Sequence, residues 1–186
     1  MNYKKYLMRD RGEKFMTKCI AEPMSRNEIS LMAKKIRIIA GSYDKLYFDI
    51  VEFLEIILPK IDENFTFSVK TIKEMGECHG LTYPDRNEIQ IREDVYERAC
   101  EDNGRDRLTM AHELFHLLQH EKENISFARI SEGGKVESFR DPEWQADAFG
   151  GELLIPRHLA CGMSVKEVVE QCRVSLSAAK YQLGKY

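Results

Sequence analysis

The stretch "AHELFHLLQH", Ala111–His120, places three histidines four residues apart, with a glutamate directly after the first. Four residues are slightly more than one helical turn, so His112, His116 and His120 lie near one stripe of a helix. His112 and His120 are two turns apart, about 12 Å along the helix axis at 1.5 Å per residue. One metal ion can therefore bind only a neighbouring pair of these histidines.

The pair His112 and His116 is favoured because Glu113 follows its first histidine, whereas Leu117 holds the equivalent position in the second pair. A helical HExxH sequence supplies two zinc ligands and a carboxylate that acts as general base toward the attacking water. We therefore predict that His112 and His116 bind one zinc ion and that Glu113 is the catalytic base. A structural role at the helix end is predicted for His120, since histidine is electrostatically favoured there.

A catalytic zinc site needs a third protein ligand. The metzincin pattern would place a glycine three residues and a histidine six residues after His116. Those positions hold Gln119 and Lys122, which excludes that class. A carboxylate on a second helix remains.

The best candidate for the third ligand is Glu143, in the first turn of a predicted second helix. Asp147 follows one turn later on the same face, where it can accept the far ring N–H of a ligand histidine and fix its tautomer. Gly150 and Gly151 continue near that face, and their missing side chains would let the two helices pack closely.

The flanking segments predict an α+β fold in which helices and a small sheet surround the motif helix. Apolar residues at helical spacing predict two helices between residues 27 and 61, the second ending near Pro59. Alternating apolar residues predict strands within 65–72 and 87–91. The further predicted helices are the motif helix from Arg107 to about Lys122, a helix capped by Asp141 that closes before Pro156, and two short helices between Ser164 and Leu183 with a turn at 173–175.

Length, charge and cysteine content limit the kinds of protein that this sequence can be. The 186 residues, with 28 Lys and Arg against 31 Asp and Glu, fit one domain and argue against nucleic-acid binding through bulk charge. Five scattered cysteines without a CxxC pair are typical of reduced thiols, and no signal-peptide or membrane-spanning stretch is present, so we expect a cytoplasmic protein. We expect an N-terminal segment at 1–27, a metallopeptidase domain at 28–160 and a C-terminal helical extension at 161–186 packed on it.

Several roles stay open from the sequence. Tyr83 and His79 are both candidates to stabilise the oxyanion of a tetrahedral intermediate, and nothing in the pattern chooses between them. Cys78 beside His79 is a weak signal for an inhibitory thiolate ligand. The strand at 88–91 is either an exposed edge that holds an extended substrate or a core strand. The C-terminal helices look like a helix-turn-helix, but their small positive excess favours packing on the domain over DNA binding.

The segments "RDRLTMAHELFHLLQH" and "EWQADAFGGELLIP" resemble the ImmA/IrrE family of metallo-endopeptidases, gluzincin-like zinc peptidases with a compact zincin-like domain. The similarity extends from about Glu28 to the C-terminus. It implies that His112, His116 and Glu143 bind one Zn²⁺ per chain, with Mn²⁺ as a substitute, and that Glu113 is the base. Two departures are Phe115, where many relatives carry glycine and where the bulk would narrow the cleft, and Gln145, where many carry glutamate.

The resemblance also implies a substrate. It points to a regulatory protease that cleaves a helix-turn-helix (XRE-type) repressor and so derepresses a mobile element or stress regulon. The alternative is a regulatory protein that binds a repressor or DNA without cutting. Glu113 favours the protease, because a purely structural zinc site needs no base. We expect no direct sequence-specific DNA binding and no membrane association.

Overall fold

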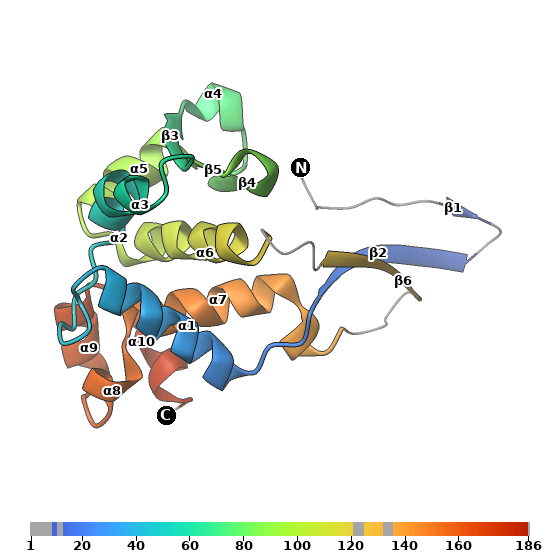
Figure 1. Cartoon of the computed structure of the whole chain (residues 1–186). Helices are drawn as coiled ribbons and strands as arrows, with labels where there is room; N and C mark the ends of the chain where they lie inside the picture. The colour runs from blue at the N-terminus through green and yellow to red at the C-terminus, as the bar shows by residue number, and fades with distance from the viewer. Residues whose placement is uncertain (1–8, 11–12, 121–124, 132–135, 186) are drawn as a thin grey trace.

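The computed structural model describes residues 9–10, 13–120, 125–131 and 136–185, with side chains described for 20–119 and 136–185. Helix α6 (Gly104–His120), which carries the HExxH sequence, lies between two groups of elements (Figure 1). A small sheet with helices α2 to α5 lies on one side of α6, and helices α1 and α7 to α10 lie on the other. The chain is thus α+β, as predicted.

The strands are β1 (Arg9–Asp10), β2 (Glu13–Ala21), β3 (Thr66–Lys70), β4 (Gly80–Tyr83), β5 (Glu88–Arg92) and β6 (Ile125–Ser131). The helices are α1 (Arg26–Ile39), α2 (Ile50–Glu52), α3 (Leu58–Ile61), α4 (Ile72–Met75), α5 (Glu93–Cys100), α6, α7 (Pro142–Leu154), α8 (Arg157–Ala160), α9 (Val165–Cys172) and α10 (Leu176–Leu183). The sequence predicted α1, the helical stretch from α2 to α3, α6, α7, α9, α10, β3 and β5, and it missed β1, β2, β4, β6, α4, α5 and α8.

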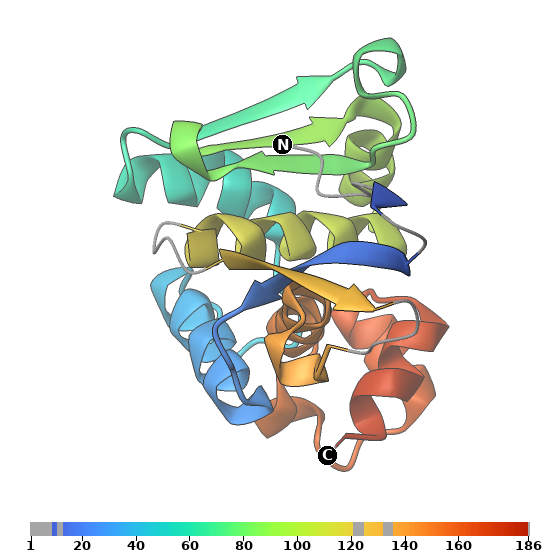
Figure 2. The same ribbon diagram turned by 90° about the vertical axis from the view of Figure 1, so that its right-hand side faces the viewer.

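The sheet beside α6 has the strand order β3-β5-β4, with β3 parallel and β4 antiparallel to β5. Ile89 and Ile91 of β5 are fully buried, which matches the apolar alternation in the sequence. The strand at 88–91 is therefore the central strand and not an edge. Figure 2 shows that the edge strand nearest α6 is β4.

The second predicted helix continues beyond Pro59. A π-helical turn at Phe53–Ile57 joins α2 to α3, and the Leu58 N–H donates to the Phe53 carbonyl. Pro59 then lies in the first turn of α3, directly after the π-helical turn, and the Asp62 N–H donates to the Leu58 carbonyl at 2.9 Å. The helix therefore ends at Ile61.

Helices α6 and α7 pack closely through a glycine. A Cβ added to Gly150 would lie 2.8 Å from Leu108 Cδ1 and 3.6 Å from Ala111 Cβ of α6. The prediction that Gly150 lets the two helices pack closely is therefore confirmed. Gly151 faces a different helix, since its added Cβ would lie 2.7 Å from Gln182 Oε1 of α10.

The C-terminal helices α9 and α10 are joined at Arg173, which adopts a left-handed backbone conformation with φ 52°. Cys172 and Ala179 of this pair are fully buried in the common core. The guanidinium of Arg107 on α6 donates to the Cys172 carbonyl at 2.9 Å and to the Phe48 carbonyl at 2.6 Å. The pair is therefore attached to the motif helix, and its likeness to a DNA-binding helix-turn-helix stays a prediction. Within the described part of the chain, no helix combines the length and apolarity needed to cross a bilayer.

Candidate metal centre

Two histidines of α6 and one glutamate of α7 converge on a single point. His112 Nε2 and His116 Nε2 lie 3.0 Å apart, and the Glu143 carboxylate oxygens lie 3.4 Å from the first and 3.6 Å from the second. Among the described residues, these three form the one group of acidic, histidine or cysteine side chains close enough to share an ion. The structure thus brings together the three side chains that the spacing predicted as metal ligands.

The separations suit a tetrahedral zinc ion. Ligand atoms about 2.05 Å from a tetrahedral centre lie about 3.3 Å from one another. The two histidine nitrogens are 3.0 Å apart, His112 Nε2 is 3.4 Å from Glu143 Oε2, and His116 Nε2 is 3.6 Å from Glu143 Oε1. Two imidazoles and one carboxylate are also the donor set of several catalytic zinc sites. The residues present therefore fit the metal.

The three candidate ligands differ in their exposure to solvent. The His112 and His116 side chains are only 18% and 13% exposed, whereas that of Glu143 is 67% exposed. The histidines therefore form the floor of the site and the glutamate stands at its solvent side. A substrate or a water molecule can approach a site of this form.

Asp147 holds His112 from the far side of its ring. Its Oδ1 lies 2.9 Å from His112 Nδ1, which leaves Nε2 to face His116 and Glu143. Burial disfavours the charged imidazolium, but the hydrogen bonds with Asp147 and Glu143 outweigh it and raise the pKa of His112 to about 10. The two carboxylates thus make the site favourable for positive charge, which a divalent cation supplies as well as a proton.

Glu113 points toward strand β4 and not into the ligand group. The Thr82 hydroxyl lies 2.8 Å from Glu113 Oε2 and 3.0 Å from the Glu113 backbone carbonyl. Burial raises the pKa of Glu113, although the charge of His112 and the Thr82 hydrogen bond oppose the shift. A half-buried carboxylate with a raised pKa beside a metal site suits a general base working near neutral pH.

The comparison with known families agrees with this geometry. The family model Peptidase_M78, described as the IrrE N-terminal-like domain, matches residues 68–183, which is more than half of the chain. The chain belongs to this metallopeptidase family. The match begins within β3 and extends to the end of α10, and it includes both helices that carry the cluster. No curated protein matches the chain in sequence.

In this Peptidase_M78 member, the start of α7 is built to present Glu143. Asp141 caps the helix by accepting from the Glu143 N–H at 3.0 Å, and Pro142 occupies the first turn, both as predicted. Gln145 is buried, and its amide donates to the carbonyls of Glu22 at 2.9 Å and Phe139 at 2.8 Å. Gln145 therefore anchors the helix start and leaves Glu143 to the metal site.

Phe115 does not narrow the cleft. Its side chain is 1% exposed and packs on the Phe149 ring of α7, with ring centroids 5.3 Å apart. The expectation of a narrowed cleft is therefore wrong, because position 115 lies on the core-facing stripe of α6.

The remaining predicted residues lie around β4. His79 precedes the strand and its carbonyl accepts from the Arg92 N–H at 3.0 Å, while the Tyr83 ring lies under the Arg86 guanidinium at 5.0 Å. Neither residue, nor the half-buried free Cys78, belongs to the His112–His116–Glu143 cluster. Their predicted roles stay predictions, and the His120 side chain lies outside the described side chains.

Two residues of the Peptidase_M78 site were missed from the sequence. Gly80 and Thr82 of β4 both face Glu113. The strand "GLTY" is only four residues long and begins with a glycine, so the alternation of Leu81 and Tyr83 was too short to predict a strand. The one available signal was the pairing of a glycine and a threonine two residues apart, the spacing that shares a strand face.

Proposed function

We propose that this chain is a zinc-dependent endopeptidase in which His112, His116 and Glu143 hold one metal ion and Glu113 is the general base. The observation that best supports this is the convergence of three ligand side chains beside a carboxylate that is not one of them. A purely structural zinc site usually closes all four positions with protein ligands and needs no base. The family membership supports the same reaction class.

The residues of the chain have separate tasks in this reaction. When bound, zinc supplies Lewis-acid chemistry that polarises a carbonyl and makes water more acidic, and Mn²⁺ is the proposed substitute. Glu113 takes the proton of the attacking water and then delivers it to the leaving amine nitrogen. Asp147 keeps the His112 Nδ1 protonated, so that Nε2 presents its lone pair to the metal. Tyr83 and His79 remain the proposed alternatives for stabilising the oxyanion.

We infer that the substrate is an extended protein segment. Strand β4 is the edge strand beside α6, and an edge strand can hold a peptide by main-chain hydrogen bonds. A scissile bond must then lie in a loop, a linker or a locally unfolded stretch. The resemblance to ImmA/IrrE proteins supports a helix-turn-helix repressor as the partner, and a cut between its DNA-binding and oligomerising parts would relieve repression.

The test is to mix the zinc-loaded chain with the helix-turn-helix repressor encoded beside its gene and to map products by mass spectrometry. Cleavage at one or a few flexible positions, absent with Glu113→Gln, would support the proposal. Tight binding of an intact repressor without product, across a range of zinc and manganese concentrations, would instead favour a non-cleaving regulatory protein.

A further inference from the structure

The hydroxyl of Thr82 has two acceptors within reach but only one proton to donate. The Glu113 carboxylate oxygen Oε2 is the nearer, at 2.8 Å, against 3.0 Å for the backbone carbonyl of the same residue. The carbonyl lies within α6, where helical geometry already supplies it with an N–H donor. A carboxylate is also the stronger acceptor. The hydroxyl proton therefore goes to Oε2.

Gly80 leaves the space that Glu113 occupies. A Cβ added to Gly80 would lie 2.6 Å from Glu113 Cγ and 2.9 Å from both Cδ and Oε1. Gly80 and Thr82 are two residues apart, so they share one face of β4. This face of the strand provides room for the carboxylate at one position and a hydrogen-bond donor at the other.

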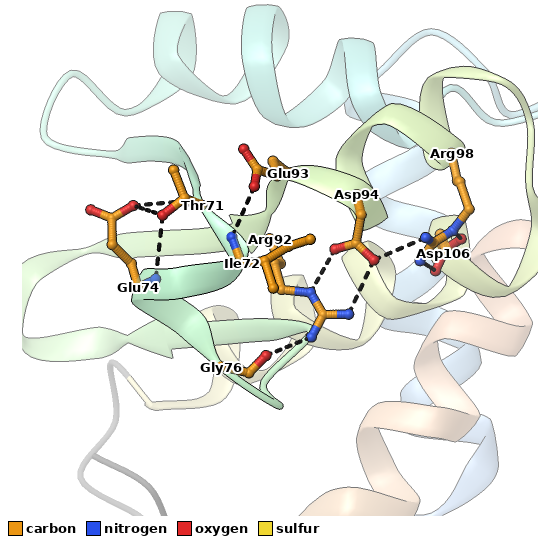
Figure 3. A network of polar contacts seen from close by, with 9 residues as sticks. All are labelled: Thr71, Ile72, Glu74, Gly76, Arg92, Glu93, Asp94, Arg98 and Asp106. Carbon is orange, nitrogen blue, oxygen red and sulfur yellow. Dashed lines mark hydrogen bonds and ion pairs between the residues drawn. The ribbon is translucent and has the colours of Figure 1, made fainter.

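A chain of polar contacts connects Gly76, in the segment before β4, to helix α6 (Figure 3). Arg92 of β5 donates to the Gly76 carbonyl at 2.8 Å and binds Asp94 at 2.5 Å. Asp94 binds Arg98 of α5 at 2.9 Å, and Arg98 binds Asp106 of α6 at 2.6 Å. The segment that leads into β4 is therefore connected to the helix that carries Glu113.

We propose that Thr82 is a positioning residue for catalysis: its hydroxyl holds the Glu113 carboxylate in one orientation on the edge strand, with Gly80 providing the space. The inference rests on the proposed function of Glu113 as the base. A threonine that only joined the strand to the helix would affect stability and substrate binding. A positioning residue lowers the turnover number as well, and its effect on stability depends on the presence of the Glu113 side chain.

The first test compares Thr82→Val, which keeps the shape and removes the hydroxyl, with Thr82→Ser, which keeps the hydroxyl. The probe is dye-labelled casein, an unstructured protein, and kcat, KM and bound zinc are measured for each variant. We expect Thr82→Val to lower kcat roughly tenfold to a hundredfold, with unchanged KM and zinc content, and Thr82→Ser to restore most of the loss. An unchanged kcat in Thr82→Val, or equal losses in both variants, would overturn the inference.

A second test does not depend on activity. Thr82→Val and Glu113→Ala are made singly and together in the full chain, and the urea midpoint of unfolding is measured. If the Thr82 hydroxyl donates to the Glu113 carboxylate, Thr82→Val lowers the urea midpoint less in the Glu113→Ala background than in the parent. Additive shifts would contradict the inference. If the zinc-loaded parent cuts neither casein nor the repressor, the endopeptidase proposal fails. The comparison of the single and double variants then still shows whether the Thr82 hydroxyl binds the Glu113 carboxylate.

Discussion

Asp147 and His112 lie on different helices, and Asp147 Oδ1 is 2.9 Å from His112 Nδ1. The contact joins α7 to α6 through a candidate ligand, because the opposite ring nitrogen of His112 faces Glu143 and His116. One helix thus supplies both a candidate ligand, Glu143, and the group that orients another ligand.

Replacing Asp147 should weaken metal binding without removing a ligand. We expect Asp147→Ala to lower zinc affinity by about 10- to 100-fold, since the His112 ring loses the acceptor that fixes its tautomer. Competition with a zinc-binding dye measures the effect. The exposed Glu170→Ala on α9 is the control for loss of a surface carboxylate. Equal affinities of Asp147→Ala and the parent would show that the contact does not orient the ligand.

Replacing Glu143 should remove the third ligand itself. We expect Glu143→Ala to lose most of its bound zinc after gel filtration, as measured by elemental analysis, because two histidines alone leave the tetrahedral site half filled. Its fold should persist, since the Glu143 side chain is 67% exposed. Stoichiometric zinc at parental affinity would mean that another residue completes the site.

Glu113→Gln should separate chemistry from metal binding. The amide nearly matches the carboxylate in shape but cannot accept the proton of the attacking water, so we expect at least about a hundredfold loss of kcat with zinc content retained. Circular dichroism and zinc analysis confirm the integrity of the variant. Cleavage of the repressor within a few-fold of the parental rate would exclude Glu113 as the base.

The cluster of candidate ligands was predictable in part, because the spacing within each helix is local. Helical periodicity alone places His112 beside His116 and Glu143 beside Asp147, and the capping residue Asp141 marks where the second helix begins. The meeting of the two helices, however, depends on tertiary packing. The sequence supported it only through Gly150 and the family resemblance.

The surroundings of Glu113 were not predictable in the same way. Thr82 contacts a residue 31 positions away, and β4 exists as a strand because it pairs with β5. Likewise, β2 pairs with β6 more than a hundred residues later. Such pairings depend on the whole fold, and a strand of four residues such as β4 carries little local signal.

The last prediction concerns Gln145, which is 2% exposed and donates both amide hydrogens to backbone carbonyls, those of Glu22 and Phe139. A glutamate here has no N–H to donate, and its charge would face two carbonyl oxygens in a buried site. We expect Gln145→Glu to lower the free energy of unfolding by at least about 2 kcal/mol at pH 8.

The loss of stability in Gln145→Glu should be larger at high pH than at low pH. Burial among carbonyls raises the folded-state pKa of the new carboxyl above its unfolded value of about 4.3, so the folded state binds the proton more tightly. The variant therefore recovers stability as pH falls through the raised pKa, and its deficit is smaller at pH 5 than at pH 8. Urea unfolding at both values, with the exposed Gln171→Glu as control, measures this difference. A deficit that is absent, or equal at both pH values, would show that the Gln145 amide does not anchor the start of α7.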